Sequence, residues 1–177
     1  MPNVKRFAGE LFVGAMKNPP SKDRVVQAFD VDSTLTQDPY GPREMFASKD
    51  GYFDAARDYP PNEAVADLAR LLASKGDHIA IATARPPERL QETIDWLERH
   101  NIPYDQVMHS TGDEVSGVAK QEMLQALQDQ YKMVGTLFDD SPYNIQGARM
   151  QGVSGIHLDT NSAYWDAHPE YVYPYGR

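Results

Sequence analysis

From about residue 24 onward, short apolar runs alternate with longer stretches in which apolar residues recur at helical spacing. Short, mainly apolar runs bounded by turn formers are typical of strands whose two faces are both covered. Five such runs predict strands: Val25–Phe29, His78–Thr83, Gln106–His109, Val134–Phe138 and Val153–Leu158. Strands that alternate with helices favour an α/β domain with a mostly parallel central sheet.

Each long stretch between these strands carries one apolar stripe, as a helix packed against a sheet does. The stripes are Val65, Leu68, Leu71 and Leu72 before Gly76; Leu90, Ile94 and Leu97 after Pro86 and Pro87; Val118, Leu124 and Leu127; and Ile145 and Ala148 before Gly152. Proline is favoured where a helix begins and glycine just after it ends, so these residues mark helix boundaries. We therefore expect a three-layer, Rossmann-like domain with helices on both faces of the sheet.

Three segments fall outside this alternation. Residues 37–61 are rich in turn formers and aromatic residues, and they predict a short excursion from the sheet, called here the lid, rather than a separate domain. The apolar content of Phe7–Met16 suggests a short N-terminal helix. The tyrosine-rich tail, residues 159–177, either packs on its own domain, which is commoner, or forms a homodimer surface. The whole chain, 1–177, is expected to be one domain with its core at about 24–158.

The chain has 177 residues, no cysteine, a net charge of −9 and 41% hydrophobic residues. The lack of cysteine excludes thiol catalysis, cysteine-ligated metals and disulfides. No apolar run approaches the roughly 20 residues of a membrane span, and the N-terminus lacks the order of a signal peptide, so we expect a cytoplasmic protein without membrane contact. The acidic balance argues against stable, sequence-independent binding of nucleic acid, but not against a pocket that binds one phosphate.

Pairs of acidic residues follow two of the predicted strands. Asp30 and Asp32 come after Val25–Phe29, and Asp139 and Asp140 come after Val134–Phe138. An Asx turn explains one aspartate after a strand more easily than two. The carboxyl ends of parallel strands meet at one edge of a sheet, and buried like charges require a cation or a proton between them. The two pairs together therefore predict a site for Mg²⁺, which prefers oxygen ligands.

A third strand end carries groups that suit a phosphate. Thr83, Ala84 and Arg85 follow the strand His78–Thr83 and precede a helix, where a hydroxyl, backbone N–H groups and a guanidinium can bind phosphoryl oxygens. A helix cap with a solvated arginine is the alternative. Lys120 lies near the start of a predicted helix; a lysine there is usually solvated, but it could offset the acidic pairs.

These residues, in this order, resemble the haloacid dehalogenase-like (HAD) superfamily of aspartate-nucleophile phosphatases. The resemblance covers about residues 24–158 and rests on Asp-x-Asp-Ser-Thr at 30–34, on Thr83, on Lys120 and on Asp139-Asp140. Thr83-Ala-Arg85-Pro and Phe138-Asp-Asp-Ser further resemble the phosphatase half of polynucleotide kinase/phosphatases.

The resemblance implies a role for each of these residues. Asp30 attacks phosphorus, Asp32 serves as general acid and base, and Thr83 and Lys120 hold phosphoryl oxygens. The implied Mg²⁺ ligands are the Asp30 side chain, the Asp32 backbone carbonyl and Asp140, with Asp139 in support. Candidate substrate contacts are Ser33, which replaces a commoner glycine, together with Thr34, Ala84 and Arg85.

The resemblance implies that the lid, residues 37–61, selects the substrate. It is too short for a large cap, so the cleft is expected to be open to a nucleotide or to the 3′-phosphate of a nucleic-acid end. Its aromatic residues either stack on a base or pack the lid onto the domain, the latter being slightly favoured: Tyr40, Phe46, Tyr52 and Phe53. A phosphatase of small metabolites and a silent module that only binds phosphate or Mg²⁺ remain alternatives. No G-x-x-x-x-G-K-[ST] loop supports an attached kinase.

Overall fold

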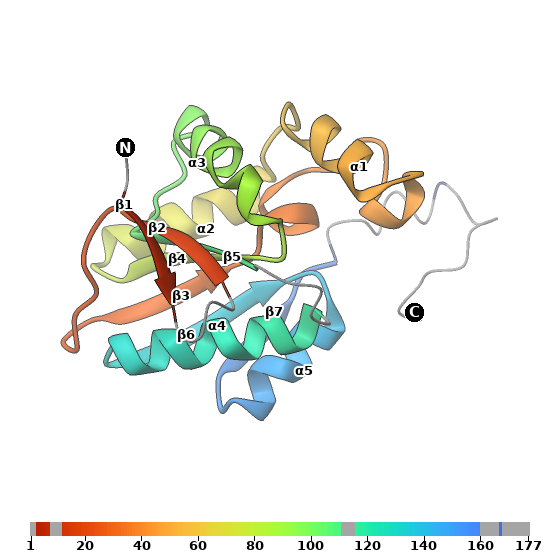
Figure 1. The fold of residues 1–177 in the computed structure, drawn as a ribbon. Coiled ribbons are helices and arrows are strands. Elements are labelled where there is room, and N and C mark those ends of the chain that lie inside the picture. Colours follow the sequence, from red (N-terminus) through yellow and green to blue (C-terminus); the bar gives the residue numbers. More distant parts are fainter. Residues whose placement is uncertain (1–2, 8–11, 111–115, 160–166, 168–177) are drawn as a thin grey trace.

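Seven strands form one sheet in the computed structural model, which describes residues 3–7, 12–110, 116–159 and 167 (Figure 1). The strand order across the sheet is β1-β2-β5-β4-β3-β6-β7. The strands β3 to β7 are mutually parallel, whereas β2 runs antiparallel to both β1 and β5. The strands are β1 (Asn3–Phe7), β2 (Phe12–Met16), β3 (Val25–Phe29), β4 (His78–Thr83), β5 (Gln106–Ser110), β6 (Met133–Asp139) and β7 (Ser154–His157).

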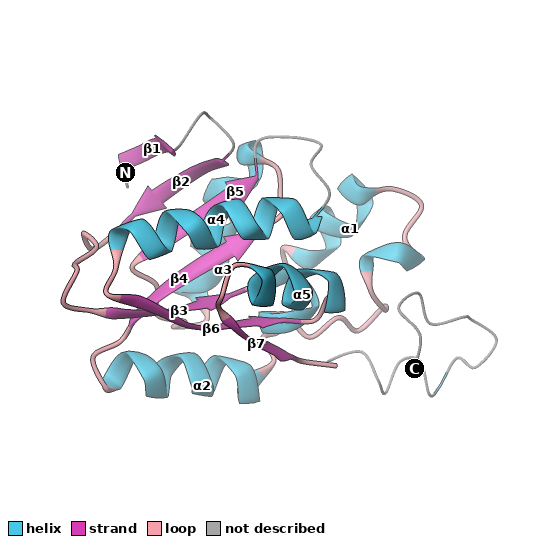
Figure 2. Cartoon of the chain, turned by 90° about the horizontal axis from the view of Figure 1, so that it is seen from below, coloured by secondary structure: helices cyan, strands magenta, loops and turns pink. Residues whose placement is uncertain are grey.

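Helices cover both faces of the sheet and give the predicted three layers (Figures 1 and 2). The helices α2 (Glu63–Ser74) and α3 (Leu90–Arg99) pack on one face, where their apolar residues join Phe29, Ile79 and Ile81 in the larger core. The helices α4 (Ser116–Gln130) and α5 (Pro142–Met150) pack on the other face against Val26 and Ala28. Among the described residues, no helix is long and apolar enough to cross a membrane.

The sheet and the four helices predicted from the apolar pattern are confirmed. β3 and β4 have the predicted bounds, β5 and β6 are slightly longer than expected, and β7 is shorter. Two residues of the predicted stripes are exposed, since Leu71 is 51% exposed and Val118 is 47% exposed. The stripes therefore identified the helices correctly but overestimated how far their apolar faces extend.

The N-terminal helix predicted over Phe7–Met16 is wrong. Phe12–Met16 forms the strand β2, whose residues pair with those of β5 from Gln106 to Ser110. Val13 and Ala15, two residues apart, both pack on the larger core, which is the period of a strand and not of a helix. Because the partner strand is about 90 residues away in sequence, local apolar content did not reveal this pairing.

The lid folds as an excursion from the sheet, as predicted. A tight turn, Val31–Leu35, precedes the lid. The lid itself contains one short helical turn, Arg43–Met45, and the helix α1 (Lys49–Ala56). Ser48 caps α1 by accepting a hydrogen bond from the Gly51 N–H at 3.0 Å. Tyr52, Phe53, Ala56 and Tyr59 form a small core of their own. The lid is therefore an ordered layer that lies beside α3 (Figure 1).

Candidate active site

The predicted site residues meet at the carboxyl ends of the three adjacent strands β4, β3 and β6. Phe29, the last residue of β3, is in register with Ile81 of β4 and with Phe138 of β6. The Asp30 N–H continues the ladder by donating to the Phe138 carbonyl at 3.0 Å. This register brings Asp30 and Asp139 together although they are far apart in the sequence, as expected of an α/β sheet.

Lys120 lies at the centre of the site and is completely buried. Its Nζ donates to Asp30 Oδ1 at 2.8 Å, to Asp139 Oδ2 at 2.8 Å and to the Ala82 carbonyl at 2.6 Å, so all three of its protons are used. Burial alone would lower the pKa of Lys120, but the carboxylates of Asp139 and Asp30 outweigh burial and raise it. The alternative of a solvated surface lysine does not hold.

Asp139 is saturated by hydrogen bonds from the protein. Besides Lys120, its carboxylate accepts from the Ser141 N–H at 2.9 Å and from Asn144 Nδ2 at 3.0 and 3.1 Å. Asn144 lies on α5 and is buried. Its role could not be predicted from the sequence, because an asparagine on a helix is usually a surface residue. Asp139 is thus held in a fixed orientation behind Asp30.

Asp140 points toward Asp30 from the other side. The Thr34 hydroxyl lies 3.3 Å from both Asp30 Oδ2 and Asp140 Oδ1, so the two carboxylates share one neutral hydroxyl. Burial first, and then the charge of Asp139, raise the pKa of Asp30 to about 7. Burial and the same neighbouring charges also raise the pKa of Asp140. The single positive charge of Lys120 therefore does not balance the carboxylates of this part of the site.

The donor set fits a hard divalent cation. One ligand atom from each of Asp30, Asp139 and Asp140 lies within 4.8 Å of the others. Carboxylate oxygens that repel one another in a buried site suit Mg²⁺, which would relieve the repulsion and would keep part of its water shell. The Asp32 side chain is not among these three.

The Asp32 side chain is held by Arg85. The guanidinium donates from Nε to both carboxylate oxygens at 3.0 and 3.1 Å and from Nη2 at 2.7 Å. Its Nη1 donates to the Thr93 hydroxyl at 3.1 Å, and its face lies 5.8 Å from the Phe53 ring centroid. With Arg85 only 2% exposed, the structure places it against Asp32 and the lid and rules out a solvated arginine.

The remaining predicted residues line the same corner. Thr83 is buried, and its hydroxyl accepts a hydrogen bond from the Arg85 N–H at 3.2 Å, while Ala84 between them is half-buried. Ser33 is a buried residue with φ of 61°, in the left-handed region that favours glycine, which explains why glycine is the commoner residue of the motif. Eight of the predicted site residues come from the carboxyl ends of β3 and β4 and from α4, and they lie around one set of charged groups. Asp139 and Asp140, at the end of β6, belong to the same set.

A buried histidine, which sequence reasoning left unassigned, lies beneath this corner. His109 Nδ1 is 3.0 Å from the Pro86 carbonyl, and Nε2 has no hydrogen-bond partner among the described residues. Burial lowers the pKa of His109 to about 4. His109 is therefore neutral at physiological pH and supports the loop that carries Arg85.

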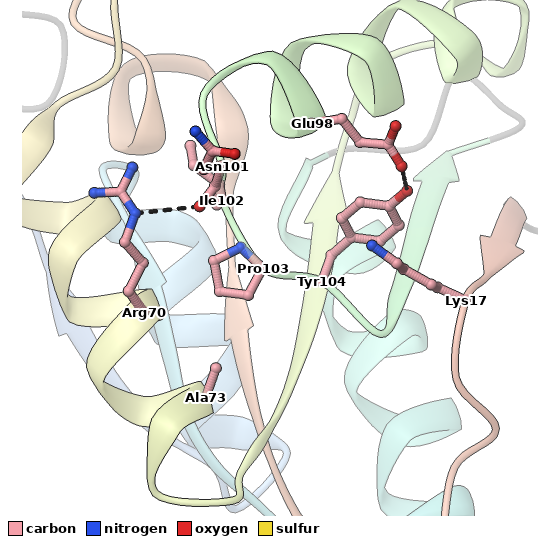
Figure 3. A pocket seen from close by; sticks show the side chains of 8 residues that line it. All are labelled: Lys17, Arg70, Ala73, Glu98, Asn101, Ile102, Pro103 and Tyr104. Carbon is pink, nitrogen blue, oxygen red and sulfur yellow. Dashed lines mark hydrogen bonds between the residues drawn. The ribbon is translucent and has the colours of Figure 1, made fainter.

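A separate hollow of about 570 Å³ lies at the opposite, amino-terminal edge of the parallel strands (Figure 3). Arg70 on its rim donates to the Asn101 carbonyl at 3.2 Å, and the Tyr104 hydroxyl donates to Glu98 at 2.8 Å. Lys17 lies 4.8 Å from the centroid of the Tyr104 ring. These polar groups thus bond to neighbouring residues of the same surface, and the hollow is remote from the acidic site.

The fold and the order of the site residues define a HAD-type phosphatase domain. The family model described as the phosphatase domain of the polynucleotide kinase PNKP matches residues 25–162, and the chain belongs to this family. This confirms the resemblance inferred from the sequence. Among curated proteins, none matches the chain.

Solved structures of known proteins share the fold. In a Pnkp1/Rnl/Hen1 RNA repair complex, a chain matches with a TM-score of 0.63 and 18% identity, over 86% of this chain and 47% of that one. A haloacid dehalogenase-like hydrolase from Streptococcus pneumoniae matches with a TM-score of 0.54 and 18% identity, over 76% and 84%. The class C acid phosphatase from Bacillus anthracis with tungstate bound matches with a TM-score of 0.57 and 17% identity, over 85% and 64%. The chain thus spans about half the length of the Pnkp1-complex chain that it matches.

Replacing Asp140 by asparagine is predicted to stabilise the metal-free protein and to remove its response to Mg²⁺. Because burial raises the pKa of Asp140 above its ordinary 3.8, the ionised form destabilises the fold at neutral pH. We expect Asp140→Asn to raise Tm in EDTA at pH 8 by about 2–4 °C, which is roughly 1 kcal/mol for a chain of this size. The gain should shrink as the pH falls and the parent carboxyl takes up a proton.

Thermal unfolding with and without Mg²⁺ measures both effects, and Asp54→Asn, an exposed acid of the lid, is the matched control. The parent and the control should gain Tm on addition of Mg²⁺, whereas Asp140→Asn should not. An equal gain in all three proteins would show that Asp140 does not hold the metal.

Proposed function

We propose that this protein is a Mg²⁺-dependent phosphomonoesterase that forms an aspartyl-phosphate on Asp30 and acts on a nucleotide or on the 3′-phosphate of a nucleic-acid end. The observation that carries the proposal is the contact of Asp30 with Lys120 at 2.8 Å, beside Asp140, in a chain of the PNKP phosphatase family. A carboxylate with one oxygen fixed by a buried cation and the other beside the Thr34 hydroxyl suits nucleophilic attack.

In the first step, an oxygen of Asp30 forms a bond to phosphorus while the bond from phosphorus to the substrate oxygen breaks. Water then attacks the aspartyl-phosphate and releases inorganic phosphate, which restores the Asp30 carboxylate. Lys120 orients Asp30 and offsets negative charge during both steps. Thr83 and backbone N–H groups at the end of β4 are positioned to bind phosphoryl oxygens.

Asp32 supplies and removes the protons. It donates a proton to the leaving oxygen, and it later takes one from the attacking water. Arg85 fixes both oxygens of the Asp32 carboxylate and stabilises the charge that remains after Asp32 has donated its proton. Arg85 is therefore proposed to act on the substrate through Asp32, since its other contacts are Thr93 and the lid.

Asp30, Asp140 and the backbone carbonyl of Asp32 would hold Mg²⁺, and Asp139 would support this set through its own hydrogen bonds. The ion supplies positive charge that binds the phosphate and reduces the repulsion between the substrate and the carboxylates. Without a cation, the negative charges of Asp30, Asp139 and Asp140 exceed the positive charge of Lys120, and a phosphate dianion would add to the excess.

The lid leaves one aromatic residue for substrate contact. Tyr52 and Phe53 are buried in the lid core and Phe46 packs against it, which bears out the packing alternative for these three residues. Tyr40 is 68% exposed, and it lies two residues from Asp38, which is bonded to the Ser33 turn. The Tyr40 ring lies beside that of Tyr59, with centroids 6.1 Å apart. An exposed ring on the lid suits stacking on a base, and this supports a nucleotide or a nucleic-acid end as the substrate.

The substrate class is tested by Mg²⁺-dependent phosphate release from 3′-phosphorylated oligonucleotides, mononucleotides, sugar phosphates and p-nitrophenyl phosphate. We expect the highest kcat/KM with the 3′-phosphorylated compounds and a loss of about 10⁴-fold or more in Asp30→Asn. The control is Asp129→Asn, an exposed acid on α4. Preference for sugar phosphates would favour a metabolite phosphatase, and no release by the folded protein would favour a silent binding module.

Replacing Tyr40 by alanine is predicted to weaken binding of substrates that carry a base. Loss of one stacking contact worth about 1–3 kcal/mol should raise KM for a 3′-phosphorylated oligonucleotide by about 5- to 150-fold. Tyr40→Phe retains the ring and should behave like the parent. Steady-state kinetics with glycerol phosphate, which has no ring to stack, provide the comparison. An equal rise in KM for glycerol phosphate would contradict base stacking.

A further inference from the structure

A buried carboxylate outside the predicted site, Asp38, lies at the start of the lid and links the Ser33 turn to the helix α1. Asp38 is only 8% exposed and accepts hydrogen bonds from three hydroxyl groups. Ser33 Oγ and the Tyr52 hydroxyl donate to Oδ2 at 2.5 and 2.8 Å, and Thr36 Oγ1 donates to Oδ1 at 2.6 Å. Burial raises the pKa of Asp38 to about 6, and the three hydrogen bonds offset part of this rise. All three of these partners are neutral hydroxyl groups, so none of them balances the charge of the carboxylate.

The first contact of Asp38 fixes the backbone next to Asp32. Ser33 has a left-handed backbone, which a residue with a Cβ atom rarely adopts without support. Asp38 supplies this support through the Ser33 hydroxyl, and Thr36, which also bonds Asp38, accepts from the Ser33 N–H at 2.9 Å. The direction in which Asp32 leaves the backbone is set by the turn at Ser33.

The second contact of Asp38, with Tyr52, connects it to the Asp32 carboxylate through residues of α1. Tyr52 is a completely buried residue of α1, and its ring packs edge-on against Phe53 with centroids 5.6 Å apart. Phe53 in turn lies over the guanidinium of Arg85, which binds both oxygens of Asp32. Asp38 therefore restrains Asp32 in two ways. It fixes the backbone next to Asp32 through Ser33, and it fixes the Asp32 side chain through the rings of α1 and Arg85.

We propose that Asp38 is a positioning residue that aligns Asp32 for proton transfer and couples this alignment to the seating of the lid helix α1. The inference rests on the proposed function, in that Asp32 is taken as the general acid. It assigns to Asp38 no contact with the substrate, the phosphate or the metal.

The test compares two phosphate esters that differ in their need for a general acid. An alkyl phosphate, such as the best 3′-phosphorylated substrate of the panel, requires protonation of its leaving oxygen, whereas 2,4-dinitrophenyl phosphate does not. We expect Asp38→Ala to lower kcat/KM for the alkyl phosphate by about 10- to 100-fold, as a misaligned catalytic group does. For 2,4-dinitrophenyl phosphate, the loss should stay within about threefold. A merely structural role would lower both values equally.

Two further variants separate positioning from loss of charge. In Asp38→Asn, the amide oxygen can still accept from Ser33 and Tyr52, and the amide nitrogen can donate to Thr36 Oγ1, whose own proton can turn to the Val31 carbonyl at 3.4 Å. We therefore expect Asp38→Asn to keep kcat/KM for the alkyl phosphate within about fivefold of the parent. Adding Ser33→Gly to Asp38→Ala should recover at least about fivefold, because glycine adopts the left-handed turn without support.

Tyr52→Phe removes only one of the three hydroxyls and serves if Asp38→Ala does not fold, as judged by thermal unfolding. It should show a smaller loss that is again confined to the alkyl phosphate. Asp58→Asn, at an 85% exposed acid of the lid, is the control and should match the parent. Equal losses with both esters in Asp38→Ala or Tyr52→Phe, or no loss, would overturn the positioning role. A parent protein inactive toward every ester would instead contradict the proposed function.

Discussion

The site depends on one buried ammonium group placed among carboxylates. Lys120 joins the strand ends β3, β4 and β6 through Asp30, the Ala82 carbonyl and Asp139. Burying a lysine or an aspartate alone is strongly unfavourable, so each of these groups requires the others. The helix α4 supplies Lys120 and also packs its buried residues on the smaller core, so the packing that stabilises this face of the sheet places the charge. Removing Lys120 or one of its carboxylate partners would leave an unpaired buried charge, so the charged groups of the site also determine the stability of the fold.

The same arrangement leaves more negative than positive charge in the site, and this excess can bind a cation. Asp139 is satisfied by Lys120, Ser141 and Asn144, whereas Asp30 Oδ2 and Asp140 Oδ1 share the neutral Thr34 hydroxyl. Repulsion that is unfavourable in the metal-free protein becomes binding energy for a cation. The carboxylates of the site are held from two sides. Hydrogen bonds fix Asp139 on one side, and on the other side Asp38, Tyr52 and Arg85 connect the lid to the site.

The sequence was sufficient to predict the layers of the fold and the residues of the acidic site. Apolar runs located the five parallel strands, and parallel strands necessarily bring Asp30, Thr83 and Asp139 to one edge. What the pattern could not show depends on contacts between distant segments. The strand β2 pairs with β5, so its residues were mistaken for a helix. Asn144, Thr93 and Asp38 are buried by their partners, and polar residues in a helix or turn carry no signal of such burial. Placement of the aromatic lid residues likewise required the structure, since Tyr40 and Tyr52 differ only in which way they face.

The central claim is that Asp30 becomes covalently phosphorylated. The most direct measurement mixes the protein with Mg²⁺ and 2,4-dinitrophenyl phosphate, stops the reaction with acid within milliseconds, and locates the phosphoryl group by mass spectrometry of peptides. Asp32→Asn should accumulate the adduct, because the group that activates the hydrolytic water is missing while this leaving group needs no acid. The account predicts one phosphoryl group, attached to the peptide that contains Asp30 and absent from Asp30→Asn. Turnover by the parent with no adduct in either protein, or an adduct on another residue, would contradict it.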